Sequence, residues 1–222
     1  TTYCDPKSFV DLWKWYGEPV DPHEQQDAVE FIQMLVDQIN DLIPGIASQF
    51  TGKITHTTVG VGVDFRSESI EQFIVFSVEV DGFETLESSL KTFLQPDIFT
   101  GPDQYNSEEF GKIDANRYHR ISEAPSTLII QLKRFSYSMS TGERVKVCSK
   151  FSFGSELDLS AVMEDPSDEC MYDLTGVIMH TGTAHGGHYY SFCRLPDEHW
   201  VCCNDTFVKY TSLQKVLAKG EG

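Results

Sequence analysis

Three polar residues near the C-terminal end of the chain have the types and spacing of the base half of a catalytic triad. His188 begins an aromatic, strand-prone segment, and Asn204 and Asp205 end the segment that returns after a turn at residues 195–198. A three-residue turn would pair His188 with Asn204, and a four-residue turn would pair it with Asp205. Directly opposed residues of an antiparallel pair lie about 4.5–5.5 Å apart, so either partner can fix the tautomer of a general base. A histidine that is merely hydrogen-bonded to a neighbour inside a hairpin would show the same spacing.

The segment before this hairpin, residues 180–187 (HTGTAHGG), has little apolar character. Its adjacent glycines, Gly186 and Gly187, predict a mobile loop. They would let the backbone approach a narrow substrate, although loop flexibility alone also explains them. His180 and His185 lie in the same loop, where they either contact a substrate or have no functional role.

A helix is predicted from about residue 21 to residue 43, because apolar residues recur along it at intervals of three or four. Asp21 would cap it, Pro22 suits the first helical position and Glu24 completes a capping box. The pair Pro44 and Gly45 would end it.

Two acidic residues of this helix, Asp27 and Glu30, are three positions apart and share a face. Paired carboxylates of this kind can bind an arginine side chain. The alternative is a solvated acidic face near a helix N-terminus, which the helix dipole favours.

The remaining chain predicts mainly strands. An amphipathic helix is expected within residues 1–17, a β-rich region over 50–110 with a strand at 73–80, and a buried strand at 126–135. Residues 137–143 predict a turn, 144–147 a returning strand, and 212–217 a short helix.

Composition limits the partners and the compartment. The chain has 222 residues, 17 basic against 34 acidic side chains and a net charge of −17, which argues against nucleic acid or an anionic membrane as partner. No apolar run approaches the length of a membrane span. The six cysteines form no CxxC pair, and three of them lie in strands where a small apolar residue would serve. These features predict a cytoplasmic or nuclear protein with free thiols.

Three motifs together resemble the ubiquitin-specific protease family. GVIMHTGTAHGGHYYSFCR followed by WVCCND is similar to the family's histidine box, QQDAVEF at residues 25–31 to its QQDA helix, and LIIQLKRF at 128–135 to its central strand. They occur in the family's order and span nearly the whole chain. The resemblance implies an α+β, papain-like cysteine protease fold, mainly antiparallel, with a helical thumb remnant at 1–50 and fingers and palm at 51–222. Within the latter, the fingers would take about 51–120 and the palm about 70–95 and 121–222.

The resemblance also implies roles for individual residues. His188 would be the base, Asn204 its orienting group, and Asp205 an assistant or substitute. Asp27 and Glu30 would grip the arginines of ubiquitin's C-terminal tail. The same groove would be completed by other residues: Phe135, His180, His185, Gly186, Gly187 and Tyr189. Ubiquitin or ubiquitin-conjugated proteins are the expected partners.

The family's fingers often hold a structural zinc ion on two CxxC pairs. Here Gly60 and Val63 stand at the first pair, and the second falls near Ser107 and Phe110. None of these residues carries a thiolate, so the expectation is metal-free fingers and no cofactor.

One family motif has no counterpart in the sequence: the cysteine box that precedes the QQDA helix. Cys4 lies near that place but lacks the residues that would seat it at a helix start with a lowered pKa. The expectation is therefore a deubiquitinase whose nucleophile lies outside these residues, so that the chain alone is inactive. Two alternatives remain open: a non-catalytic ubiquitin-binding module or pseudoprotease, and a papain-like acyl transfer on another substrate.

Overall fold

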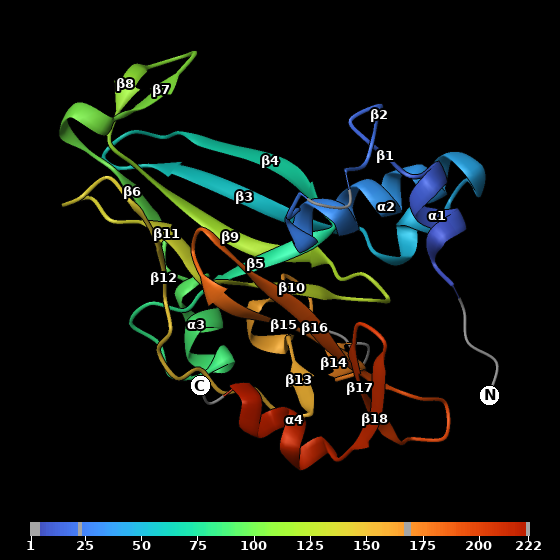
Figure 1. Ribbon diagram of the computed structural model, residues 1–222. Coiled ribbons are helices and arrows are strands. Elements are labelled where there is room, and N and C mark those ends of the chain that lie inside the picture. Colours follow the sequence, from blue (N-terminus) through green and yellow to red (C-terminus); the bar gives the residue numbers. More distant parts are fainter. Residues whose placement is uncertain (1–4, 22–23, 167–169, 221–222) are drawn as a thin grey trace.

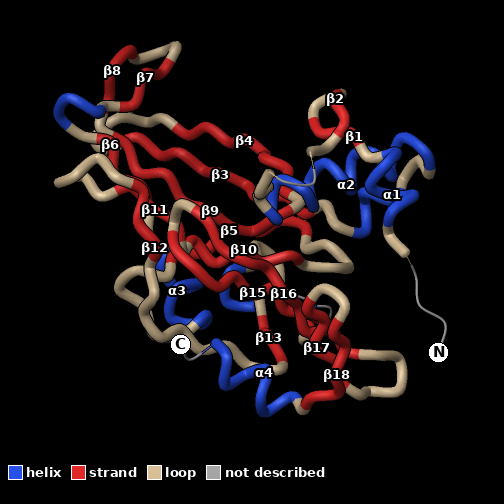
Figure 2. The backbone as a smooth tube through the Cα atoms, viewed as in Figure 1, coloured by secondary structure: helices blue, strands red, loops and turns tan. Residues whose placement is uncertain are grey.

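The computed structural model describes residues 5–21, 24–166 and 170–220. Within these ranges the chain forms an α+β structure whose small sheets are mainly antiparallel, as expected. Figure 1 shows the helices within residues 7–42 together at the end of the molecule where the N-terminus lies, and the helices at 86–92 and 213–220 on the side of the C-terminus. Strands occupy the middle of the molecule between these helical parts (Figure 2). The α-helices are α1 (Lys7–Leu12), α2 (Ala28–Leu42), α3 (Leu86–Thr92) and α4 (Leu213–Gly220).

Helix α1 packs against α2 through aromatic rings. The hairpin of β1 (Lys14–Trp15) and β2 (Glu18–Pro19) contacts α2 through hydrogen bonds, in which the Tyr16 hydroxyl donates to Glu30 and the Gln38 carboxamide donates to the Lys14 carbonyl. Trp13 is buried, and its ring centroid lies 5.4 Å from that of Phe9 and 5.1 Å from that of Phe31 in α2. The expected N-terminal amphipathic helix is thus present but ends at Leu12.

The predicted start of the second helix is wrong. Asp27, not Asp21, caps α2: its Oδ1 accepts hydrogen bonds from the backbone N–H groups of Val29 (2.8 Å) and Glu30 (3.1 Å). Asp21 instead begins a turn, in which its carbonyl accepts the N–H of Glu24, and Pro22 lies outside the described residues. Residues 24–27 (EQQD) offer no apolar side chain to the core. Since burial of an apolar face stabilises most helices in proteins, α2 begins only where its apolar repeat begins.

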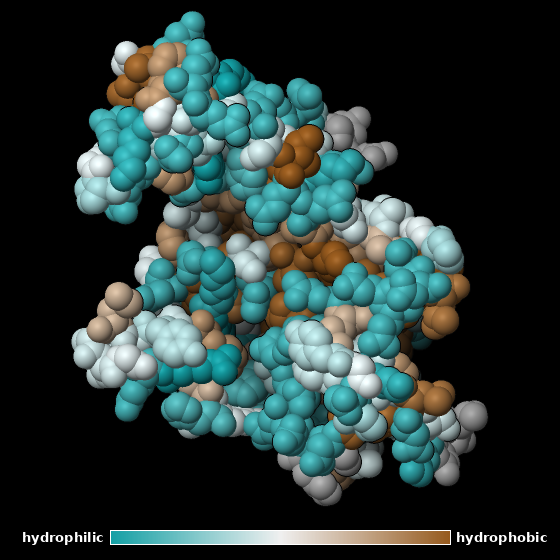
Figure 3. Space-filling model, turned by 90° about the horizontal axis from the view of Figure 1, so that it is seen from above, coloured by the Kyte–Doolittle hydropathy of each residue, from teal (hydrophilic) through white to brown (hydrophobic). Residues whose placement is uncertain are grey.

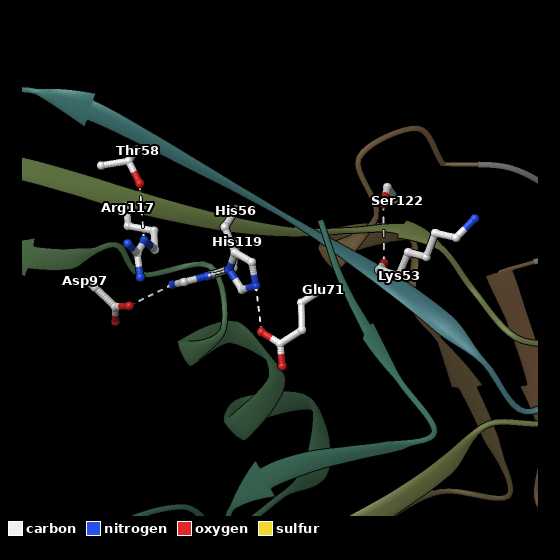
Figure 4. A network of polar contacts seen from close by, with 8 residues as sticks. All are labelled: Lys53, His56, Thr58, Glu71, Asp97, Arg117, His119 and Ser122. Carbon is white, nitrogen blue, oxygen red and sulfur yellow. Dashed lines mark hydrogen bonds and ion pairs between the residues drawn. The ribbon is translucent and has the colours of Figure 1, made fainter. Parts of the chain in front are cut away.

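The long sheet has the strand order β4-β3-β9-β6 and consists of β3 (Gly52–Gly60), β4 (Arg66–Phe73), β6 (Asp97–Phe99) and β9 (Ala115–Glu123). A row of polar side chains crosses all four strands (Figure 4). Nδ1 of His56 lies 2.7 Å from Nδ1 of His119; the two Nε2 atoms lie 3.0 Å from Glu71 and 3.1 Å from Asp97, respectively. This row links the strands in addition to their backbone ladder.

The tip of this sheet carries the four positions at which the resemblance would place zinc ligands. Near it lies the hairpin of β7 (Tyr105–Ser107) and β8 (Gly111–Ile113). The buried Ser107 accepts the N–H of Phe110 through Oγ at 2.8 Å, and the ring of Phe65 lies 6.4 Å from that of Phe110. Val63 packs against Gly60. Hydrogen bonding and apolar contacts therefore join these positions, and the absence of zinc stays a prediction.

The main core lies where the long sheet meets the parallel pair β5 (Val75–Glu79) and β10 (Ile129–Lys133). The predicted strand at 126–135 is present in shortened form as β10, but it is less buried than predicted: Ile129 to Leu132 are only partly buried and Lys133 is exposed. Its surroundings include several fully buried side chains: Val80, Ile121, Phe151 and Leu159. The shorter elements around this core are β11 (Phe135–Tyr137), β12 (Arg144–Lys146), β13 (Glu156–Asp158), β14 (Met171–Asp173) and 3₁₀ turns at Ile46–Gln49, Gly101–Asp103 and Ser160–Val162.

The C-terminal sheet, with strand order β15-β16-β17-β18, consists of β15 (Gly176–Thr183), β16 (Gly186–Arg194), β17 (Trp200–Asn204) and β18 (Phe207–Thr211). Phe192 and Trp200 pack on Val216 of α4, which forms where the tail helix was predicted.

Residues 180–187 do not form the predicted loop. They are the paired ends of β15 and β16, joined by a two-residue turn, with Thr181 opposite His188 and Gly182 opposite Gly187. A Cβ atom at Gly187 would collide with the carbonyl oxygen of Thr181 and the ring of His180. Gly187 therefore permits the two strands to pair closely. The two adjacent glycines alone had predicted a loop.

The predicted register of the next hairpin is also wrong. Arg194 pairs with Trp200 rather than with Glu198, because residues 195–199 form a longer connection in which the N–H of Leu195 bonds the carbonyl of His199. The β16–β17 pairing ends at Ser191 opposite Cys203. His188 thus extends beyond the ladder and reaches Asn204 through its side chain.

Candidate active site

His188, near the start of β16, contacts Asn204 at the end of β17. Nε2 of His188 lies 2.7 Å from Oδ1 of Asn204. Because an amide oxygen only accepts hydrogen bonds, this contact requires a proton on Nε2 and leaves the lone pair of the neutral ring on Nδ1. The His188 side chain is 45% exposed, so a reacting group can approach the ring. A histidine held in this tautomer can take a proton from a group beside Nδ1.

Asp205 is less well placed than Asn204 to hold the imidazole. Its Oδ2 lies 3.8 Å from Nε2 of His188, and its side chain is 73% exposed. It takes a positive φ of 48° in the two-residue turn between β17 and β18. Aspartate and asparagine tolerate that backbone conformation better than most residues. The geometry therefore gives Asp205 a role in the turn and only a distant electrostatic contact with His188.

The tip of the β15–β16 hairpin gathers His180, Tyr189 and Phe135 from the predicted groove. The ring centroid of His180 lies 4.8 Å from that of Tyr189 and 5.3 Å from that of Phe135. His185 lies in the exposed turn at the very end of the hairpin. The predicted groove residues of this segment are thus brought together, with His185 at the margin.

Lys146 of β12 forms hydrogen bonds with the β15 strand of this hairpin. Its Nζ lies 3.1 Å from Nδ1 of His180, 2.9 Å from the carbonyl oxygen of His180 and 3.3 Å from that of Gly182. Burial, and then the positive charge of Lys146, lower the pKa of His180 below its usual value. His180 is therefore held neutral, with Nδ1 accepting from the ammonium group.

The first turn of α2 lies against the other side of the hairpin. Burial, and then the negative charge of Asp27, raise the pKa of Tyr189, whose hydroxyl also has a hydrogen bond with the backbone of Ala28. Glu30 accepts a hydrogen bond from the hydroxyl of Tyr16, which raises the pKa of that tyrosine. Asp27 therefore lies close to Tyr189 of the hairpin, whereas Glu30 contacts Tyr16. Both carboxylates already have a partner within the chain, and their contact with a substrate stays a prediction.

An open cavity of about 510 Å³ separates α1 and α2 from the C-terminal sheet. Much of its lining is aromatic or otherwise apolar, including Trp13, Phe31, Ile178 and Tyr190, and Asp27 and Cys203 also line it. Seen from above, the surface is hollowed between two lobes, and hydrophobic side chains gather at the floor of that hollow (Figure 3).

In the described part of the chain, the ring of His188 contacts Asn204 and lies near Asp205, and neither is a thiol. Cys203 neighbours Asn204 in the sequence, but burial raises the pKa of its thiol, which is the opposite of activation. Cys170 is buried, Cys148 is exposed in a loop, and Cys193 and Cys202 lie within the sheet. Cys4 lies outside the described residues.

Three side chains that contact residues of the predicted groove were not predicted from the sequence: Gln25, Lys146 and Tyr16. Gln25 binds the backbone of Gly187 through its carboxamide. Its place in the QQDAVEF motif, beside Asp27, was a signal that could have been followed. No local pattern distinguishes Lys146 or Tyr16 from surface residues, because their partners are distant in the sequence.

Replacing Lys146 by methionine is expected to raise the pKa of His180, because the ammonium charge is removed while burial remains. The shift should be visible in an NMR titration of the His180 ring. In the unsubstituted chain the unfolded state binds this proton more readily than the folded state. The contribution of this site to stability is therefore lost as the pH falls below about 6.5, and the substitution should weaken that loss. An unchanged His180 titration would contradict the described contact.

In the described part of the chain, no helix is both long and apolar enough to cross a membrane.

Comparison with known proteins gives one consistent result. The family model described as ubiquitin carboxyl-terminal hydrolase matches residues 1–220. Ubiquitin carboxyl-terminal hydrolase 15 of Schizosaccharomyces pombe is 30% identical over 98% of this chain, which covers 20% of that protein. Ubiquitin carboxyl-terminal hydrolase 9Y of Mus musculus is 30% identical over 86% of this chain and 9% of its own length. The chain thus spans a fifth or less of these two curated relatives.

Solved structures agree with the sequence relatives. The SAGA Ubp8/Sgf11/Sus1/Sgf73 DUB module bound to ubiquitin aldehyde matches with a TM-score of 0.77 and 25% identity, over 88% of this chain and 47% of that one. A variant of the module bound to monoubiquitin matches with a TM-score of 0.79 and 28% identity, over 88% and 46% of the two chains. Together with the family model, these matches confirm that the chain belongs to the ubiquitin carboxyl-terminal hydrolase family and has the papain-like fold of its ubiquitin-specific protease branch.

Proposed function

We propose that this chain is the larger part of a thiol-dependent deubiquitinase domain, which hydrolyses the peptide or isopeptide bond at the C-terminal glycine of ubiquitin. The observation that carries the proposal is the 2.7 Å contact between Nε2 of His188 and Oδ1 of Asn204. It leaves Nδ1 of an accessible imidazole available as a base. Membership of the family and the presence of ubiquitin in both solved neighbours support ubiquitin as the substrate.

In the proposed reaction Nδ1 of His188 takes the proton of a cysteine thiol, and the thiolate attacks the carbonyl carbon of the glycine. The resulting imidazolium gives its proton to the leaving amine as the C–N bond breaks. Water, deprotonated by the same Nδ1, then hydrolyses the thioester. Asn204 keeps the ring oriented and stabilises the imidazolium through the Nε2 hydrogen bond.

The nucleophile is proposed to come from a segment outside these residues. The described cysteines support this, since Cys193 and Cys202 lie within strands of the sheet and burial raises the pKa of the Cys203 thiol. The cavity of about 510 Å³ between the N-terminal helices and the C-terminal sheet offers space for such a segment. Its aromatic lining would be buried against an apolar face of the added segment.

The groove beside α2 is proposed to bind the C-terminal tail of ubiquitin. Asp27 and Glu30 would pair with its arginines, Phe135, His180, His185 and Tyr189 would line its path, and Gly186 and Gly187 would let its backbone approach. Asp27 keeps its cap in this arrangement, since a carboxylate has a second oxygen.

The double substitution Asp27→Asn, Glu30→Gln is expected to weaken binding of ubiquitin. Each charge-assisted hydrogen bond that is lost removes roughly 1.5–3 kcal/mol, so binding should fall at least about tenfold. Asparagine caps a helix as well as aspartate does, which separates the loss of charge from the loss of α2. The measurement is isothermal titration of ubiquitin.

A matched control is Asp37→Asn, Asp41→Asn, which removes two exposed charges farther along the same helix. Equal weakening by both double variants, or no weakening by the first, would contradict tail binding at Asp27 and Glu30.

The division into a thumb remnant at 1–50, fingers at about 51–120 and palm at about 70–95 and 121–222 is proposed on the same footing. We also place the protein in the cytoplasm or the nucleus, where the described cysteines would remain reduced thiols. No nucleic acid or membrane partner is proposed, in keeping with the net charge of −17.

The proposed function is tested with ubiquitin that carries a C-terminal electrophile, added to this chain and to the full-length protein, with adducts read by intact mass. We expect no adduct on the chain and one on the full-length protein, mapped to a cysteine outside these residues. An adduct within residues 1–222 would refute the external nucleophile. No adduct on either would leave a non-catalytic ubiquitin-binding module as the function.

A further inference from the structure

The carboxamide of Gln25 forms two hydrogen bonds with the backbone of one residue, Gly187. Nε2 of Gln25 donates to the Gly187 carbonyl at 2.8 Å, and Oε1 accepts the Gly187 N–H at 3.0 Å. The two residues are 162 positions apart and belong to the segment before α2 and to β16. Gln25 thus joins the two parts of the molecule that face each other across the candidate active site.

The contact of Gln25 with Gly187 takes the place of strand pairing that β17 does not provide at this end of β16. The pairing of β16 with β17 runs only from Ser191 to Arg194 of β16, so the backbone groups of Gly187 on that edge lie beyond the ladder. A carboxamide presents its oxygen and one N–H of its NH2 group on the same side, so it can supply the acceptor and donor that the opposed residue of an antiparallel ladder would offer to Gly187. Gly186 leaves room for it: a Cβ atom at Gly186 would lie 3.2 Å from Oε1 of Gln25.

The residues bound from the α2 side lie immediately before and after His188. Gly187 is bound by Gln25, while the side-chain hydroxyl of Tyr189 has a hydrogen bond with the backbone of Ala28 and lies near the charge of Asp27. The His188 side chain itself is 45% exposed. The backbone of His188 lies outside the β17 ladder. On this side it is therefore held by the residues just before and at the start of α2, Gln25 and Ala28.

We propose that Gln25 is a positioning residue, which holds the backbone of His188 so that Nε2 meets Asn204 and Nδ1 points to the reacting thiol. The proposal rests on the proposed function for its kinetic consequence but not for its structural one. Since Asp27 lies two residues from Gln25, the same segment that would bind the ubiquitin tail also sets the place of the base. Gln25 acts only through Gly187 and does not itself touch the reacting atoms.

The substitution Gln25→Glu tests this role with little change in size. An oxygen of the carboxylate now faces the Gly187 carbonyl in place of a donor, so one bond is lost. Repulsion between these two acceptors pushes the side chain away and weakens the remaining bond from the Gly187 N–H. In the full-length protein we expect kcat for a ubiquitin substrate to fall roughly tenfold or more, with KM changed less than about twofold. In this chain, NMR should show a displaced His188 ring resonance and faster exchange of the Gly187 amide proton.

The matched control is Gln33→Glu, which adds the same charge at an exposed position of α2 and should leave kcat, the Gly187 amide and the melting temperature unchanged. A wild-type kcat in Gln25→Glu would overturn the proposal, as would a fall in kcat with an unchanged Gly187 exchange rate and His188 resonance. If the full-length protein hydrolyses no ubiquitin substrate, the proposed function fails, and the NMR comparison still decides whether Gln25 positions His188.

Discussion

Replacing His188 by alanine in the full-length protein is expected to lower kcat for ubiquitin cleavage by about 10²–10⁴-fold, the contribution typical of a positioned general base. KM should change little, because the ring is placed to act on the thiol and the leaving amine rather than to grip ubiquitin. The measurement is steady-state hydrolysis of a ubiquitin-derived fluorogenic substrate.

His199→Ala is the matched control, since His199 is an exposed histidine in the connection between β16 and β17 whose ring contacts Asp197. Its removal should leave kcat unchanged. If His188→Ala retained the wild-type kcat, the base would lie elsewhere and the 2.7 Å contact with Asn204 would be structural.

The contact between His188 and Asn204 could be anticipated from the sequence because it is nearly local: two strands joined by a short connection keep their ends together over many choices of register. The register itself could not be anticipated. It depends on the connection at residues 195–199, which is longer than the turn-forming residues alone indicated. The predicted contact between His188 and Asn204 is present although the predicted register is wrong, because the two residues meet through their side chains beyond the last ladder pair.

Two other wrong predictions have a common physical cause. In each, a local sequence signal favoured one structure, and packing against the rest of the chain favoured another. Asp21 followed by Pro22 is a good helix start, but the apolar repeat that α2 buries begins only after Asp27. The glycines at 186 and 187 signal a loop, but here they permit a close strand pair and an approach by Gln25.

The contacts by which Lys146 and Gln25 hold the candidate active site could not be predicted from local sequence patterns. Lys146 reaches its carbonyl partners across 34 and 36 positions of sequence, and Gln25 reaches Gly187 across 162. Such contacts depend on how separate parts of the chain pack, which neither periodicity nor turn chemistry records. The row of side chains from Glu71 to Asp97 across the long sheet belongs to the same class, since it needs the register of three strand pairs (Figure 4).

Which neighbour orients His188 is decided by comparing two substitutions. Asn204→Ala removes the amide oxygen at 2.7 Å and should lower kcat by at least about 10²-fold, because the neutral ring is then no longer held in the tautomer with a bare Nδ1. Asp205→Asn removes only the carboxylate charge, and asparagine tolerates the positive φ of 48° that the turn needs. The Asp205→Asn variant should therefore keep kcat within a few-fold of wild type. Any fall in kcat would reflect the loss of a carboxylate that stabilises the imidazolium from 3.8 Å. The reverse ranking of the two variants would make Asp205 the orienting group. Equal and large losses would mean that the two side chains act as one unit on Nε2, and the double variant would then lose little more than either single one.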